Sequence, residues 1–347
     1  MLTRPMSLFL ALGAVAVVAS AGLGEEEPSG AAGELKCKTD PVLSRLVLSG
    51  ELAGKIDREF ADLRKRIDAL MNDPKWQPPS EENRRAMLLE ARKQMDRTYD
   101  AIEAMLGAEN KPRFVEGRKV VADSLGRMAD LAGERDRALA KLPAGDDAAQ
   151  ARFYEEFGAK FEALGIELEA ALDEKVGMVP DEPGSPQGGP TREGSGPPSR
   201  TDPLLLRLDL PPELASKVDA LVLAYARKAE RSNKELAARS GGALSPDSIP
   251  VNTEKVLAVR DLRIGALLPD GLREKFRAGA AIAADLRRKS WKLRTGAEFR
   301  SAMAGNAAEA EAIAKEANQE LARLVDEAAR QLDEKVGRAP GKPASGK

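Results

Sequence analysis

Apolar residues recur every three or four positions along most of the chain, which is the spacing of one face of an α-helix. In the first stretch of this kind, the apolar residues are Leu52, Ile56, Phe60, Leu63, Ile67 and Leu70. Ser49 precedes them at the position of an N-cap, and the turn-forming stretch from Asp73 to Pro79 follows them. Ser80 is the predicted cap of a second helix. The apolar stripe of that helix consists of Leu88, Met95, Tyr99, Ile102 and Leu106.

Two further helices are predicted before residue 178. One runs from Asn110 to Leu142 and ends at Pro143-Ala144-Gly145, a sequence that breaks helices. Either Asp146 or Asp147 is expected to cap the other helix. The stripe of this last helix consists of Phe153, Phe157, Phe161, Leu164, Leu168, Leu172 and Val176. The first half of the chain therefore predicts four helices.

The second half of the chain repeats the first. Thr39-Asp40-Pro41 returns as Thr201-Asp202-Pro203, an offset of 162 residues, and 12 of the 19 positions that begin there are identical. The same offset relates the stretch 102–114 to the stretch 264–276. Solenoid repeats have periods of about 20–50 residues, so this much longer period indicates a tandem duplication of a whole small domain.

The second copy follows the same helical plan, with a weaker last stripe. A break is predicted from Gly241 to Pro250, and Ala304-Gly305-Asn306 mirrors the break at residues 144–146. In the last helix, alanines stand where the first copy has phenylalanines. This helix either buries less surface or packs closer to its neighbour, and we expect the second copy to be the less stable half.

These patterns predict an all-α protein with two tandem four-helix units, built from long, amphipathic, antiparallel helices. The units are expected at residues 39–178 and 201–337, joined by a flexible Pro-, Gly- and Ser-rich linker at residues 179–200. Residues 22–38 and 338–347 have too few apolar side chains to offset the entropy of ordering, so they predict a disordered tether and a disordered tail. Composition agrees, because a charged fraction of 32% with only 4% aromatic residues is typical of long, solvated helices.

The first residues are typical of an export signal. Arg4 precedes an apolar run from Leu8 to Val18, and Ala19-Ser20-Ala21 forms a small-residue cleavage site, so residues 1–21 predict a signal peptide. The alternative is an uncleaved membrane anchor, but the run is shorter than the ~20 residues that a spanning helix needs. We therefore expect an exported protein, periplasmic or secreted, with no transmembrane segment after cleavage. Cys37, the only cysteine, is either a free thiol or half of an intermolecular disulfide.

The composition removes most classes of catalytic site. Histidine is absent, and a single cysteine cannot form a zinc site, so a His-based triad and a structural zinc centre are both excluded. No calcium-binding loop, phosphate-binding loop or dinucleotide-binding glycine motif occurs. Asp146-Asp147 and Glu155-Glu156 are interpreted as a helix cap and a solvated helix face. A net charge of −2 gives no strong attraction to nucleic acid. We expect a protein that is not an enzyme, carries no cofactor and binds no nucleic acid.

Two short motifs resemble those of a known family. Residues 264–276 resemble I-x-x-x-L-T-P-E-Q-R-x-K-F, and residues 46–52 and 208–214 look like L-x-L-T-x-E-Q. Both motifs are similar to those of the LTxxQ-motif proteins, the periplasmic Spy/CpxP family of small helical stress proteins. Pro269 and Leu272 replace the threonine and glutamine that name the first motif. The residues that match the motif, and that are the candidate protein-binding positions, are Leu106, Arg113, Phe114, Leu268, Arg273, Lys275 and Phe276.

The resemblance implies a thin helical cradle that holds unfolded or stress-related envelope proteins. Members of the family are usually homodimers, so it also implies that the two copies pair within the chain as a pseudo-dimer. Zinc-binding members use histidine, and this chain has none. The expected function is that of an exported protein-binding protein, an ATP-independent periplasmic chaperone or an envelope-stress modulator. The alternative is a structural spacer or assembly protein of the envelope, and metal handling through carboxylates is a third, weaker interpretation.

Overall fold

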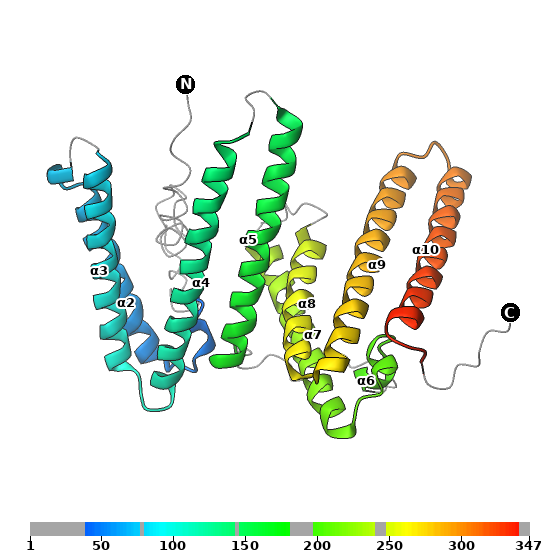
Figure 1. Ribbon diagram of the computed structural model, residues 1–347, viewed down its shortest axis with the longest axis horizontal. Helices are drawn as coiled ribbons and strands as arrows, with labels where there is room; N and C mark the ends of the chain where they lie inside the picture. The colour runs from blue at the N-terminus through cyan, green and yellow to red at the C-terminus, as the bar shows by residue number, and fades with distance from the viewer. Residues whose placement is uncertain (1–38, 77–79, 143–145, 181–196, 240–247, 340–347) are drawn as a thin grey trace. The chain divides into compact units, whose positions relative to one another are not determined.

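A computed structural model describes residues 39–76, 80–142, 146–180, 197–239 and 248–339, and all regular structure in these ranges is helical (Figure 1). The all-α prediction is therefore confirmed. The predicted signal peptide, the tether with Cys37, the break at 143–145 and most of the predicted linker and tail lie outside the described residues. The chain divides into two compact units, residues 1–185 and 186–347, and the division falls within the stretch predicted as a linker.

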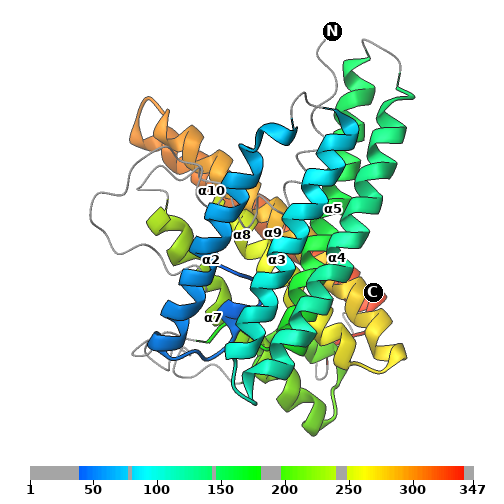
Figure 2. The ribbon, with the colours of Figure 1, turned by 90° about the vertical axis from the view of Figure 1, so that its left-hand side faces the viewer.

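The first unit consists of two helical hairpins. Helix α2 (Gly50–Met71) packs against α3 (Glu81–Met105), and α4 (Asn110–Leu139) packs against α5 (Asp147–Lys175), as Figures 1 and 2 show. Short 3-10 helices, η3 (Leu43–Arg45) and η4 (Pro74–Trp76), lie before α2 and in the first turn. The predicted caps are confirmed: Ser49, Ser80 and Asp146 each accept a hydrogen bond from a backbone N–H of the first helical turn.

The second unit has the same two hairpins. They are formed by α7 (Pro212–Arg239) with α8 (Ser248–Leu267) and by α9 (Asp270–Ala302) with α10 (Ala307–Lys335). A short helix, α6 (Pro198–Thr201), and η5 (Leu205–Leu208) precede them. The linker prediction is thus wrong at residues 198–200, which are helical. The break predicted through Pro250 is also too long, because α8 already begins at Ser248 and proline fits the first turn of a helix.

The apolar core of each unit lies at one end, where its two hairpins meet. We call this end the base and the opposite ends of the hairpins the tips. In the first unit the core joins η3 and the start of α2 to the end of α3, the start of α4 and the end of α5. Its most buried members are Leu43, Ile56, Ile102, Phe114 and Leu172. The counterparts of these residues in the second unit, Leu205, Val218, Ile264, Phe276 and Leu332, also form one core.

Beyond the base, each hairpin forms a pair of helices that we call an arm, and in the second unit α8 also contacts α9 through the Glu254–Arg287 ion pair. The apolar stripes of the arms are partly buried: Leu70, Phe153 and Phe157 are buried, whereas other members of the stripes are half-buried. In the arm of α4 and α5, this half-buried set includes Val121, Met128, Leu131, Phe161 and Leu164. The α9–α10 arm packs more closely along its length than the α4–α5 arm, with Ala297, Ala317 and Ala328 buried between its helices. The alanine-rich stripe of α10 therefore allows a closer approach, one of the two outcomes expected from the sequence.

One glycine in each unit allows the chain before the first hairpin to lie directly on the second hairpin. A Cβ atom added at Gly117 of α4 would lie 2.5 Å from Val42 Cγ1 and 2.8 Å from Val176 Cγ2. At Gly279 of α9, the counterpart of Gly117, it would lie 2.1 Å from Leu204 Cδ1. Real Cβ contacts do not occur at such distances, so glycine is required at both positions by packing.

We expect Gly279→Ala to lower the free energy of unfolding of the second unit by about 1–3 kcal/mol, because an added methyl group overfills a packed core. Gly296→Ala, also on α9 but with open space around its Cα, is the matched control, and it should raise helix stability by about 1 kcal/mol. Urea unfolding monitored through Trp291 in a Trp76→Phe background reports on the second unit alone. Equal stability of the two variants would contradict the packing argument.

Candidate protein-binding surfaces

A buried carboxylate organises the entry of the chain into the first unit. Asp40 Oδ1 accepts hydrogen bonds from the N–H groups of Val42 and Leu43, at 2.9 and 2.8 Å, and so starts the turn that becomes η3. The hydroxyl of Tyr99, on α3, donates to Asp40 Oδ2 at 3.0 Å. Burial raises the pKa of Asp40 and also that of Tyr99, whose phenol therefore stays a neutral donor. This arrangement links the first residues of the unit to its second helix.

The second unit keeps the carboxylate and changes its partner. Asp202 Oδ1 accepts from the N–H groups of Leu204 and Leu205, at 2.8 and 3.1 Å, as Asp40 does in the first unit. Asp261 stands at the position of Tyr99, so a second carboxylate replaces a hydroxyl donor. Burial raises the pKa of Asp261, and the charge of Asp202 adds to this effect, whereas Arg260, which donates at 2.8 Å, opposes it. The base of the second unit therefore contains a charge that burial disfavours.

In both units an arginine ties the stretch before the first hairpin, residues 39–49 and 202–211, to the last helix, and we call this stretch the entry segment. Arg45 Nη2 lies 2.6 Å from Glu169 Oε2 and 3.1 Å from Asp173 Oδ1 on α5. Its counterpart Arg207 lies 2.7 Å from Asp333 Oδ1 on α10. A buried ion pair adds little net stability, but leaving one partner alone is costly. These pairs hold the position of the entry segment. Both copies have arginine and aspartate at these positions, and this repetition was a signal for the ion pairs that the sequence prediction did not use.

The structure places most of the seven motif residues in the base rather than on a surface. The side chains of Leu106, Phe114, Leu268 and Phe276 are 0–6% exposed and belong to the two cores. Of the seven, Lys275 alone is exposed. The four apolar residues could contact a partner only if the base opened. The burial favours a structural role for them, while the binding role stays a prediction.

The two motif arginines are half-buried and bind backbone carbonyl groups. Arg113 donates from Nε to Val176 O at 2.7 Å and from Nη2 to Arg45 O at 3.1 Å, which joins the end of α5 to the entry segment. Arg273 donates to Gly265 O and Leu268 O, both at 2.9 Å. Gly265 O also accepts from the N–H of Leu268, so Arg273 adds a second bond there and satisfies the Leu268 carbonyl just past the end of α8. The motif therefore builds the junction between the two hairpins.

The most exposed apolar side chains lie mainly away from the base, toward the tips. Phe299 and Met303, where α9 turns into α10, are 69% and 74% exposed. The tip of the α4–α5 arm carries Tyr154, which is 51% exposed. The other tips contribute Met71 and Val251, which are also exposed. Pattern analysis missed these residues because they stand outside the apolar stripes; their position beside a predicted helix break was the available signal.

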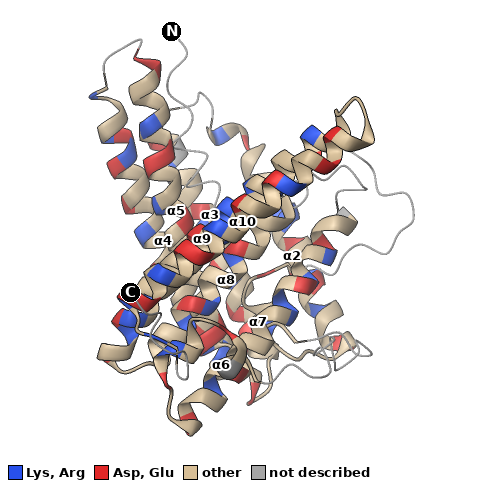
Figure 3. Ribbon diagram, turned by 90° about the vertical axis from the view of Figure 1, so that its right-hand side faces the viewer, with Lys and Arg blue, Asp and Glu red and all other residues tan. Residues whose placement is uncertain are grey.

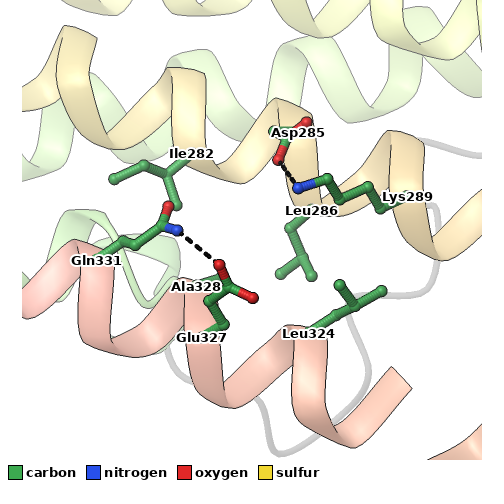
Figure 4. Close-up of a pocket in the computed structure, with 8 residues that line it drawn as sticks. All are labelled: Ile282, Asp285, Leu286, Lys289, Leu324, Glu327, Ala328 and Gln331. Carbon is green, nitrogen blue, oxygen red and sulfur yellow. Dashed lines mark hydrogen bonds and ion pairs between the residues drawn. The ribbon is translucent and has the colours of Figure 1, made fainter. Parts of the chain in front are cut away.

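Two hollows of very different size occur in the described ranges. A groove between α9 and α10 is lined by Ile282, Leu286 and Leu324 and bordered by the Asp285–Lys289 ion pair, as Figure 4 shows, and its volume of about 10 Å³ admits at most one water molecule. A larger hollow of about 440 Å³ lies where α6 and η5 meet the start of α7. No group of three or more potential metal ligands occurs in the part of the chain that is described. In the same ranges, no helix combines the length and apolar content needed to cross a membrane.

The buried charge at Asp261 predicts a pH dependence of stability. Burial raises the pKa of Asp261 in the folded state. Its contribution to the free energy of unfolding is therefore fully present below the pKa of the unfolded state, near 3.8, and is lost as the pH rises through the pKa of the folded state. We expect Asp261→Asn to match the wild-type chain near pH 3 and to become progressively more stable than it toward pH 7. The measurement is urea unfolding of the second unit across this range. Asp326→Asn, the same change at an exposed site of α10, is the matched control, and a constant difference between Asp261→Asn and the wild-type chain would contradict the assignment.

Comparisons with known proteins give no relative from which a function could be inferred. No family model matches the chain, and neither the curated proteins nor the solved structures contain a match.

Proposed function

We propose that this chain is an exported protein-binding protein that holds other polypeptides on its helical arms, as an ATP-independent periplasmic chaperone or envelope-stress modulator. The observation that carries the proposal is the half-buried part of the apolar stripes on the arms. An apolar stripe in a complete bundle is covered on several sides, whereas part of the stripe of the α4–α5 arm is only half-buried, at Val121, Met128, Leu131, Phe161 and Leu164. An apolar segment of another protein gains free energy by covering such a stripe.

The shape of the described surface fits a broad rather than a narrow specificity. The groove between α9 and α10 is too small to hold a small molecule, and the exposed apolar residues are distributed over several tips. Charged residues surround them, so the arms stay solvated when no partner is bound. The resemblance to the LTxxQ-motif proteins supports the same function. Under this proposal the two copies take the place of the two protomers of a family dimer.

A second candidate function is that of a structural spacer or assembly protein. Ion pairs between successive turns cover parts of the arms, as Lys55 with Glu51 on α2, Lys160 with Glu156 on α5 and Lys234 with Glu230 on α7. Such pairs are typical of helix faces that remain in water and bind nothing. A spacer would present these faces along its whole length and would use one dedicated contact.

Light scattering of a reduced, aggregation-prone model protein, without ATP, separates the two functions. We expect the chain from residue 22 to 347 to suppress aggregation at near-stoichiometric ratios, because its arms cover the apolar segments of the model protein. A variant with serine at Met71, Tyr154, Val251 and Phe299 should need several-fold more protein for the same effect. Val47→Ser removes a side chain that is 71% exposed at the base and is the matched control. Absence of suppression at large excess would favour the spacer function.

A further inference from the structure

One face of α9 carries two cations followed by two large apolar side chains. Arg288, Lys292, Phe299 and Met303 follow one another at intervals of four, seven and four residues, which places them on a single face of a helix. All four side chains are exposed, and Figure 3 shows Lys and Arg along α9. We call this face the α9 stripe. It combines charge and apolar surface in a fixed order from the middle of the arm to its tip.

The α9 stripe is the face that the neighbouring helices leave uncovered. On another side of α9, Leu286 faces Leu324 of α10 across the groove in Figure 4. On a third side, Arg287 makes two contacts with the carboxylate of Glu254 on α8, at 2.6 and 3.1 Å. The Leu286 side chain on one side and the Arg287–Glu254 ion pair on the other fix the rotation of α9 about its axis. The stripe is therefore held outward by the packing of the other faces.

In the part of the chain that the structure describes, Arg288 and Lys292 lack the carboxylate partners that four of the other seven cations of α9 have. Helix α9 contains nine Lys and Arg against four Asp and Glu, so its charge is not balanced internally. Arg273, Arg287, Lys289 and Arg300 have carboxylate partners at 2.6–3.7 Å. Within the described ranges, Arg288 and Lys292 form no ion pair. Their charge is available to carboxylates from another molecule.

The stripe is specific to the second copy and is not required by the fold. The positions of the first copy that correspond to Arg288 and Lys292, at the offset of 162, are Gly126 and Asp130. They do not provide the pair of cations with which the stripe begins. Both copies nevertheless form the same two hairpins and the same kind of base. The cations of the α9 stripe are therefore not needed to form these hairpins.

We propose that the α9 stripe is a docking site for an acidic, amphipathic helix of a partner protein. Two carboxylates one turn apart on the partner pair with Arg288 and Lys292, and apolar side chains farther along it pack on Phe299 and Met303. Lys292 and Phe299 are about 10 Å apart along the helix axis, a spacing that a second helix laid beside α9 reproduces with the same residue intervals. This inference rests on the proposed function and identifies one class of client and its surface.

Acidic residues near the tip favour a protein partner over an anionic membrane. Glu298 is adjacent to Phe299 in the chain, and Glu309 and Glu311 begin α10 at the same tip. Glu309 is held there because its Oε2 accepts from Gly305 N at 2.9 Å. An anionic lipid surface that took up Phe299 would approach all three carboxylates and be repelled by them. A helix that follows the stripe contacts the cations without that repulsion.

The test is binding of a labelled synthetic helix to the chain from residue 22 to 347, measured by fluorescence anisotropy. The probe is an alanine-based peptide of about 20 residues with two glutamates four apart followed by two leucines at the intervals of the stripe, which fits parallel to α9, and a second peptide with the reverse order fits antiparallel to it. The charge control is the same peptide with glutamine in place of glutamate. Wild-type chain should bind the acidic probe more tightly than the glutamine probe, and added salt should reduce this difference.

Matched variants locate the binding site. We expect Arg288→Glu with Lys292→Glu to weaken binding of the acidic probe at least tenfold, and Phe299→Ser with Met303→Ser to weaken binding of both probes. The control, Arg137→Glu with Lys141→Glu, makes the same charge change on exposed residues of the first unit and should leave binding unchanged. Because all substituted side chains are exposed, thermal unfolding followed by circular dichroism should be the same for every variant.

Three results would overturn the inference: no saturable binding of the acidic probe, equal loss of binding in the control variant, or stripe-dependent binding to phosphatidylglycerol vesicles without binding of the probe.

The aggregation assay distinguishes failure of the α9 stripe as a docking site from failure of the proposed function. A chain that suppresses aggregation equally well with and without Arg288 and Lys292, and does not bind the probe, retains the proposed function and loses the stripe as its site. A chain that binds the probe but suppresses nothing retains the stripe and loses the chaperone activity.

Discussion

The close contact between the entry segment and the second hairpin is the constraint on which each unit depends. Val42 lies on α4 at Gly117, and Leu204 lies on α9 at Gly279, at distances that leave no room for a Cβ atom. Because the entry segment continues into the first hairpin, this contact joins two hairpins that otherwise share little surface. The buried Arg45–Asp173 pair and the half-buried Arg207–Asp333 pair act at the same place. Apolar packing supplies the stability at the base, and the ion pairs fix its geometry.

This concentration of packing gives the two ends of a unit different properties. Near the base, side chains such as Ile56 and Phe114 are completely buried, and their opening requires unfolding of the unit. Toward the tips, each helix packs mainly on its hairpin partner, so local opening costs less free energy. The pairing of a stable base with less stable arms is consistent with a molecule that changes its contacts at the arms while it keeps its fold.

The helices, their caps and their repetition could be predicted from the sequence because these features are local. Ser49, Ser80 and Asp146 cap helices through bonds to residues three positions away, and the apolar spacing of three and four follows from the helix alone. The joining of the two hairpins at the base could not be predicted, since it depends on contacts such as that of Leu204 with Gly279, between residues far apart in the chain. The sequence predicts a binding surface at the motif residues, because a motif shows only that positions are constrained. Burial of Phe114 and Phe276 shows that packing is a sufficient constraint.

The length of α9 sets how far from the base a bound segment is held. Its 33 residues extend for about 50 Å, whereas a small domain is only about 30 Å across. A polypeptide attached near Phe299 therefore has room to rearrange, or to fold as a complete small domain, without colliding with the base of the same unit. Such an attachment would keep a client separate from its neighbours in the compartment while leaving most of its surface free.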